Sequence, residues 1–204
     1  MFSTAVIAVL ILFGTFCDCC IPTQTAEDVT TTTSTTSTTT TTTSTTTTTL
    51  VPSCVDSTWT LFNRDTYFWC MKAYIGSSPN ALLATQYCQT LNSAAVATGF
   101  QNAAEITTIV ATAPAGLKLW IGAQRNSDCA LVRLTAACNQ LTSFHWTDGF
   151  TTGTDGFVWK TSQPDNSLLT QSFVVVYTST GLLDDEHRWL TMQGVVCGME
   201  ATYS

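Results

Sequence analysis

Oxygen-bearing side chains surround a proline in the run Gln163-Pro164-Asp165-Asn166, and a second acidic group follows at Asp184 and Asp185. Amide and carboxylate oxygens are the ligands that calcium prefers in proteins. The alternative is an ordinary turn beside a solvated pair of acids, because proline, aspartate and asparagine are also typical turn residues. The residues alone leave both interpretations open.

The same acids could also act as a general acid and base, but the rest of the sequence does not favour an enzyme. Asp184, Asp185 and Glu186 have no second carboxylate with an evident partner, and neither His145 nor His187 lies near a serine or cysteine nucleophile motif. We therefore predict a binding protein with no catalytic residues.

Composition restricts the class of ligand. The chain has 204 residues, a net charge of -7 and only 10% charged residues. An acidic surface repels phosphate backbones, so we do not expect nucleic-acid binding. The length leaves room for one domain of ordinary size with flanking segments.

The N-terminal segment predicts secretion. Ala5 to Phe13 form a continuous apolar run that is too short to span a bilayer but has the length of a signal-peptide core. We expect a signal peptide over residues 1–17 and an extracellular, secreted protein. No later apolar run is long enough for a membrane span.

A low-complexity segment follows the expected signal peptide. Residues 30–49 are only threonine and serine, and such a run has no apolar side chains to bury in a core. We expect a disordered Ser/Thr-rich stalk over residues 18–53. It is either a bare spacer or, as we favour, a mucin-like O-glycosylated segment of a glycoprotein.

The chain contains nine cysteines, which an oxidising compartment would pair as disulfides. Six of them lie in the body of the chain, an even number, and none forms a C-x-x-C pair that would indicate structural zinc. Cys19 and Cys20, if they are retained, could link chains into a disulfide-bonded oligomer. The six body cysteines are Cys54, Cys70, Cys88, Cys129, Cys138 and Cys197.

Local patterns predict an α+β fold. The aromatic stretch over residues 59–74 has turn residues in its middle, which predicts a hairpin. One helix is expected to begin with Ser78 as its cap and Pro79 at its first position, and a second to open at Asn102 with Glu105 at capping-box spacing. After these helices come short apolar runs of strand length, separated by long loops: LWIGA, SFHWTDG, SFVVVY and QGVVCGM.

At residues 54–204 the sequence resembles a C-type lectin-like domain, most closely the secreted type with a Thr-rich stalk that is common in nematodes. The resemblance rests on motifs in the family's order and spacing: WTLFNR, WCMK, LWIGAQR, FHWTDG, TGTDGFVW, QPDN and VVCG. It implies two helices with short antiparallel sheets and long loops, held by disulfides.

The resemblance also implies a disulfide framework: Cys54 with Cys70, Cys88 with Cys197, and Cys129 with Cys138. A further long-range bridge of the family is absent, because its two positions align with Phe173 and Arg188. We expect these two side chains to touch, with the Arg188 guanidinium over the Phe173 ring.

The resemblance implies a joint calcium and sugar site around a cis proline. Gln-Pro-Asp goes with galactose-type sugars in the family, although the aromatic residue that usually accompanies the motif is missing. The implied calcium ligands are Gln163, Asp165, Gln171, Asp184 and Asp185, and the implied carbohydrate-binding residues are Gln163, Asp165, Asp184 and Trp189.

Three functions remain open on this resemblance. The first is calcium-assisted glycan recognition, as in innate immunity towards microbial or host sugars. The second is calcium-independent binding of a protein ligand by the same scaffold, which the departures at Gln171, Phe173, Leu183 and Arg188 favour. The third is a structural role in a mucous or cuticular layer, which only the stalk indicates.

Overall fold

The computed structural model describes residues 50–76 and 79–204. The expected signal peptide over residues 1–17 and nearly all of the expected stalk lie outside the described residues, as do Cys17, Cys19, Cys20 and Ser78. Among the described helices, none is long and apolar enough to cross a membrane.

The described residues form two α-helices, three short 3-10 helices and ten strands. The helices are α1 (Ala84–Leu91), α2 (Ala103–Val110), η1 (Ala81–Leu83), η2 (Ser127–Cys129) and η3 (Ser167–Leu169). The strands are β1 (Pro52–Ser53), β2 (Thr60–Arg64), β3 (Tyr67–Ile75), β4 (Val96–Ala97), β5 (Lys118–Arg125), β6 (Phe144–Trp146), β7 (Gln171–Tyr177), β8 (Leu183–His187), β9 (Gly194–Glu200) and β10 (Thr202–Tyr203).

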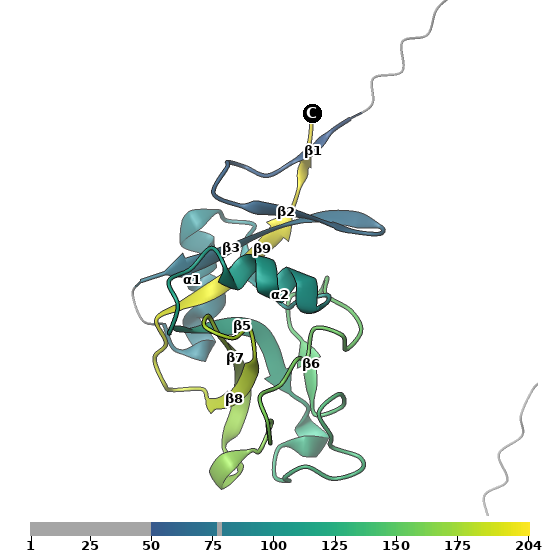
Figure 1. Ribbon diagram of the computed structural model, residues 1–204, viewed down its shortest axis with the longest axis vertical. Coiled ribbons are helices and arrows are strands. Elements are labelled where there is room, and N and C mark those ends of the chain that lie inside the picture. Colours follow the sequence, from purple (N-terminus) through teal and green to yellow (C-terminus); the bar gives the residue numbers. More distant parts are fainter. Residues whose placement is uncertain (1–49, 77–78) are drawn as a thin grey trace, which may run out of the picture. The chain divides into compact units, whose positions relative to one another are not determined.

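One mixed sheet organises the domain. Its strand order is β2-β3-β9-β5-β7-β8, with β4 paired to β9 and β6 paired to β5. Strands β5 and β9 pair in parallel, whereas the neighbours on either side pair antiparallel. Figure 1 shows β1 and the C-terminus at one end and β6, β7 and β8 with the long loops at the other. The α+β class expected from the sequence is confirmed.

Both faces of the sheet are buried, which explains the all-apolar run Val174-Val175-Val176 in β7. Successive side chains in a strand point to opposite faces. Val174 and Val176 belong to the core cluster that contains Ile106 and Ile109 of α2. Val175 belongs to the other cluster, with Ala84 and Cys88 of α1. One helix therefore contributes to the core on each side.

The predicted hairpin and the predicted cap of α2 are confirmed, whereas the first helix starts later than expected. Strands β2 and β3 pair antiparallel and turn at Asp65, which has a left-handed backbone. Asn102 caps α2 as predicted, since its side chain accepts from the N–H groups of Ala104 and Glu105. The first helical turn, however, begins at Ala81 with Asn80 as its cap, later than expected.

Pro79 is held by the core instead of starting a helix. Its carbonyl accepts hydrogen bonds from the Trp120 indole N–H, at 2.8 Å, and from the backbone N–H of Met192, at 3.1 Å. These contacts fix Pro79 against the sheet, so the helix starts only after the chain has left it.

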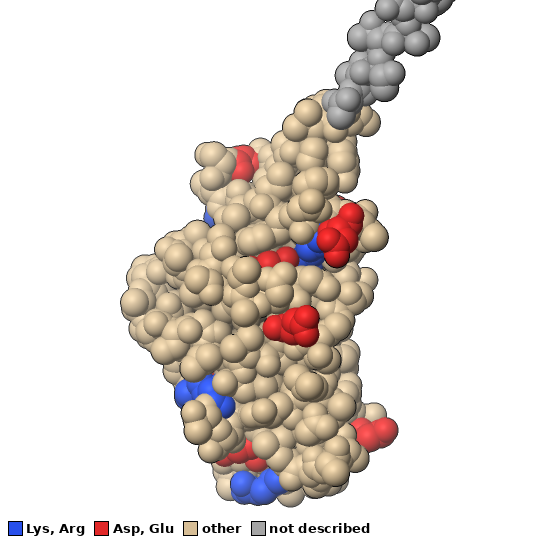
Figure 2. Space-filling model, turned by 45° about the vertical axis from the view of Figure 1, so that its right-hand side comes forward, with Lys and Arg blue, Asp and Glu red and all other residues tan. Residues whose placement is uncertain are grey.

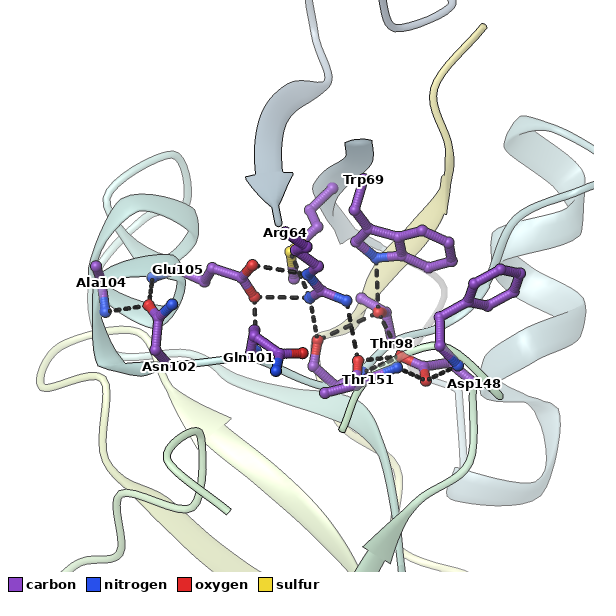
Figure 3. Close-up of polar contacts among 12 residues, drawn as sticks. Arg64, Trp69, Thr98, Gln101, Asn102, Ala104, Glu105, Asp148 and Thr151 are labelled. Carbon is purple, nitrogen blue, oxygen red and sulfur yellow. Dashed lines mark hydrogen bonds and ion pairs between the residues drawn. The ribbon is translucent and has the colours of Figure 1, made fainter. Parts of the chain in front are cut away.

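A buried polar network joins β2, α2 and the loop after β6 (Figure 3). Arg64 donates to both oxygens of Glu105, at 2.7 and 2.6 Å, and to the hydroxyl of Thr151 at 3.1 Å. The Arg64 and Glu105 side chains are only 1% and 4% exposed. Removing one partner of a buried ion pair destabilises a protein strongly. The Arg64–Glu105 pair therefore ties α2 to the hairpin.

Asp148 extends the same network. It accepts hydrogen bonds from the Thr151 hydroxyl, at 2.6 Å, and from the Gly99 N–H, at 2.8 Å. Burial acts to raise the pKa of the Asp148 carboxyl, but these hydrogen bonds and those from the Phe150 and Thr151 N–H groups outweigh it and hold the pKa below its usual value. The carboxylate thus stays charged and organises the turn after β6.

The three disulfides that the resemblance implied are all present. Cys54 pairs with Cys70, Cys88 with Cys197, and Cys129 with Cys138. The second joins α1 to β9, and the third closes a loop between β5 and β6.

The folded domain begins slightly earlier than the expected boundary at residue 54. Pro52 and Ser53 form β1 and pair with Tyr203 and Thr202 of β10. The Val51 N–H also donates to the carbonyl of Ser204, at 3.0 Å. Because these backbone groups bond to the C-terminal strand, the last residues assigned to the stalk belong to the fold.

Replacing Glu105 by glutamine should lower the free energy of unfolding by about 3–5 kcal/mol, because the Arg64 charge would stay buried without a counter-charge. Urea denaturation measures this change. The exposed Glu200 at the end of β9 provides the control, and Glu200→Gln should change stability by less than about 0.5 kcal/mol. Equal losses in the two variants would contradict this account of the network.

Removing the disulfides should have unequal effects, because closing a longer loop restricts the unfolded chain more. The Cys88–Cys197 bridge spans 109 residues and the Cys129–Cys138 bridge spans 9. In the chain-entropy estimate, double alanine variants should lose about 4.8 and about 2.6 kcal/mol respectively. Chemical unfolding of both variants checks the order, and a larger loss at Cys129–Cys138 would refute it.

Candidate functional site

The loop around Pro164 is closed by its own side chains. The Gln163-Pro164 peptide bond is cis, as the resemblance implied. The Gln163 side-chain oxygen accepts from the N–H of Asp165 at 2.8 Å, which closes a turn around the proline. The Gln163 carbonyl accepts from the Gln140 side chain at 2.6 Å, so the loop is also fixed to the segment before β6.

Asp185 of β8 fixes this loop to the sheet. It is fully buried, and its two oxygens accept from the N–H groups of Asp165, at 3.0 Å, and Asn166, at 2.9 Å. It also forms an ion pair with Arg125 at the end of β5. Burial raises the pKa of the Asp185 carboxyl, while the two N–H groups and the Arg125 guanidinium act in the opposite direction.

Arg125 is an important residue of the site that the sequence did not single out. Its side chain is 2% exposed, its guanidinium lies 4.4 Å from the centroid of the Phe144 ring, and its Nε–H donates to the Gln171 carbonyl at 2.7 Å. Arg125 is the last residue of the LWIGAQR motif. Nothing in that motif, however, indicated that a strand residue so far along the chain from Asp185 would pair with it.

Asn166 connects the same loop to the disulfide-closed loop. Its side-chain amide donates to the carbonyls of Ala130, at 3.1 Å, and Val132, at 2.8 Å, and its oxygen accepts from the Gln171 N–H at 3.2 Å. Asn166 is almost completely buried. The structure therefore brings the Gln163–Asn166 loop, the Cys129–Cys138 loop and the start of β7 into one rigid unit.

Asp184 points to the other side of β8 from Asp185, as adjacent strand residues must. Its carboxylate accepts from the Lys160 ammonium, at 2.9 Å, and from the Tyr177 hydroxyl, at 3.0 Å. The hydrogen bond to Asp184 raises the pKa of Lys160. The two acids that were expected to hold one cation together are thus separated, and each is neutralised by a basic side chain.

The remaining two predicted calcium ligands also bond within the protein. One Asp165 oxygen and the Gln171 side-chain oxygen both accept from the N–H of Ser167, at 3.0 and 2.5 Å. Among residues 50–76 and 79–204, no group of three or more His, Cys, Asp or Glu side chains is placed to hold a metal ion. Calcium requires six to eight oxygens around one point, and the side chains at this loop do not fit that requirement.

Trp189, the expected aromatic partner of the sugar, lies beyond the end of β8. Its ring is 59% exposed and lies beside the Arg188 guanidinium, 5.6 Å from ring centroid to guanidinium carbon. The Arg188 guanidinium thus lies over the Trp189 ring and not over the Phe173 ring as expected; Phe173 packs edge-to-face on Trp120, at 6.5 Å between centroids.

Comparison with known proteins identifies the fold. No protein-family model matches the sequence. A lectin from Polyandrocarpa misakiensis is 29% identical over 103 residues, which are 50% of this chain and 74% of that protein.

Several solved structures are similar in fold to this chain over most of the described residues. The crystal structure of the cow CD23 carbohydrate-recognition domain with a GlcNAc2Man3 oligosaccharide has a TM-score of 0.55 at 18% identity, over 74% of this chain and 99% of that one. A calcium-independent type II antifreeze protein has a TM-score of 0.53 at 20% identity, over 74% and 98%. C-type lectin CEL-I from Cucumaria echinata has 0.51 at 16%, over 73% and 98%. With its mixed sheet, helices α1 and α2 and three disulfides, the chain has the C-type lectin-like fold.

Proposed function

We propose that this domain is an extracellular recognition domain that binds glycans without a calcium ion, through the Gln163–Asn166 loop. C-type lectin-like domains are binding modules and not enzymes. The similarity to a lectin and to a domain crystallised with an oligosaccharide supports a carbohydrate ligand. The three disulfides support an oxidising, extracellular location. Recognition of microbial or host surface sugars would follow from these properties.

The observation that carries this proposal is a donor and an acceptor placed side by side on the loop. The Gln163 side-chain oxygen accepts from the Asp165 N–H, which orients the amide. The Nε2 donors of that amide have no partner among the described residues. Asp165 uses one oxygen for the Ser167 N–H and leaves the other free. Both side chains are half-buried. An adjacent amide donor and carboxylate acceptor match neighbouring hydroxyl groups of a sugar.

The contacts that hold the loop support independence from calcium. Arg125 supplies the positive charge that Asp185 needs, and two backbone N–H groups complete its hydrogen bonds. Lys160 does the same for Asp184. A cation at this place would have to displace existing contacts instead of completing an open shell.

A protein ligand is the second candidate, and exposed leucines favour it. Leu131 and Leu168 are 76% and 83% exposed, and they lie on the two loops that the Asn166 side chain joins. Leu168 also has a left-handed backbone, with φ of 55°. Exposed apolar side chains on neighbouring loops are a feature of protein-binding surfaces. Failure of glycan binding with retained folding would favour this candidate.

Calcium should not stabilise the protein. We expect the same melting temperature in chelator and in about 10 mM calcium, because a ligand raises the melting temperature only if it binds the folded state. Differential scanning calorimetry of the full chain makes the measurement. A calcium-dependent rise of several degrees would overturn the metal-independent part of the proposal while leaving glycan binding open.

Isosteric changes at the loop should remove glycan binding without unfolding it. Asp165→Asn keeps the oxygen that bonds Ser167 but replaces the free acceptor by a donor, and Gln163→Glu replaces the free donor by an acceptor. Each should weaken binding to a panel of immobilised glycans by roughly 10- to 100-fold, the effect of losing a hydrogen bond to a charged group.

The matched control for these variants is Asp155→Asn, which changes an exposed carboxylate elsewhere. It should bind the panel as the unaltered protein does. If Asp165→Asn and Gln163→Glu also bind normally while their melting temperatures are unchanged, the loop is not the glycan site.

A further inference from the structure

A cavity of about 770 Å³ lies at the end of β5, and residues of β5, β6, β7 and the Cys129–Cys138 loop line it. Its floor is a row of three side chains across three strands, because Gln124 of β5 is paired with His145 of β6 on one side and with Phe173 of β7 on the other. Residues directly opposite in antiparallel strands share a face. Arg125, the next residue of β5, directs its guanidinium to Asp185 on the other face.

The walls of the cavity come from the disulfide-closed loop and from the end of β8. Asp128 and Ala137 line it on the side of the Cys129–Cys138 bridge, and Ser172 and Arg188 line it on the side of β7 and β8. The Cys129–Cys138 bridge closes this loop. A cavity of several hundred Å³ with convergent polar groups is typical of small-ligand sites.

The hydrogen-bond network assigns the His145 tautomer. The Asn126 amide donates to the Thr142 carbonyl at 2.7 Å, which orients the amide and makes its oxygen face His145. That oxygen can only accept, so the His145 Nδ1, 2.7 Å away, carries the hydrogen. His145 Nε2 is then left for a ligand, since no contact to it is present among the described residues.

Several further polar groups of the cavity lack protein partners in the described part of the chain. The Gln124 amide, the Ser172 hydroxyl and the Arg188 guanidinium make no hydrogen bond there, and the guanidinium only lies over the Trp189 ring. A guanidinium offers a planar fork of donors that fits a carboxylate with two parallel hydrogen bonds. The cavity also contains one carboxylate, Asp128, which forms no ion pair with Arg188 in the described residues.

We propose that this cavity binds a sugar that carries a carboxylate, such as a uronic acid, as a second site separate from the Gln163–Asn166 loop. The carboxylate of the sugar bonds Arg188. Its hydroxyls bond Asp128, Ser172, Gln124 and His145 Nε2, and the ring lies against Phe173. A neutral sugar would leave Arg188 without an acceptor, whereas a phosphate ester would bring two charges towards Asp128.

The net charge of -7 does not prevent this binding. Interactions between exposed charges are largely screened beyond about 8 Å at physiological ionic strength, so the groups inside the cavity decide. Among these, Arg188 is the cation that the protein leaves without an acidic partner in the described residues, because Arg125 already pairs with Asp185.

The test is titration calorimetry of the full chain with D-glucuronate and with glucose. Glucuronate should bind at least about tenfold more tightly than glucose, and Arg188→Gln should weaken glucuronate binding by about tenfold or more, the effect expected for a charge-assisted pair. Ala137→Trp, which fills the cavity from its exposed wall, should abolish binding. The control Arg133→Gln removes an exposed arginine of the same loop and should have no effect.

Other outcomes would overturn the proposal. Equal binding of glucose and glucuronate, or equal binding of inorganic phosphate, would mean that the cavity does not recognise a sugar acid. Tighter binding of a short peptide with a free carboxylate would assign the cavity to a protein ligand. Loss of glucuronate binding in Asp165→Asn would place the sugar acid at the Gln163–Asn166 loop, whereas unchanged binding in that variant separates this site from the proposed function.

Discussion

The ion pair between Arg125 and Asp185 holds together the loops of the candidate site. The two side chains are 2% and 0% exposed, and they come from β5 and β8. Through Asp185 the pair fixes the Gln163–Asn166 loop, through the Gln171 carbonyl it fixes the start of β7, and the Asn166 side chain then fixes the Cys129–Cys138 loop. A buried carboxylate without such partners would cost several kcal/mol, so these loops can fold only in an arrangement that supplies them.

Other basic side chains of the chain are also paired with acidic ones. Of its seven basic residues, four form ion pairs within the described domain, and two of those pairs are almost completely buried. The face drawn in Figure 2 accordingly carries few charged side chains, and at the upper right and at the bottom acidic and basic groups lie side by side. Recognition by such a surface has to rely on neutral hydrogen bonds and on the few cations that remain, of which Arg188 lies at a cavity.

Local patterns predicted several elements of the fold but not its long-range contacts. The capping-box spacing of Asn102 and Glu105 predicted the start of α2, and the apolar run SFVVVY predicted a strand where β7 lies. The disulfide pairing came from the family resemblance alone, since six cysteines allow many connectivities. The start of the first helix was misplaced because tertiary contacts hold Pro79.

The candidate site shows the same division. Asp184 and Asp185 are adjacent in β8 and point to opposite sides, and each has a basic partner from elsewhere in the chain. The partner of Asp185 is 60 residues away in sequence, and that of Arg64 is 41 residues away. No local pattern reports which basic residue will reach which acid, because that depends on the strand order.

The neighbouring residues Gln124 and Arg125 give the end of β5 two roles. The guanidinium of Arg125 orders the Gln163–Asn166 loop on one face, while Gln124 lies on the floor of the cavity on the other. Because protein groups hold the Gln163–Asn166 loop and a disulfide closes the Cys129–Cys138 loop, a ligand has little to order there, which lowers one of the main costs of binding. In the proposed function, each region alone would contact only a small part of a glycan. A branched glycan that reached both would make its second contact within the same complex, and its effective concentration there would raise the affinity without any new interaction.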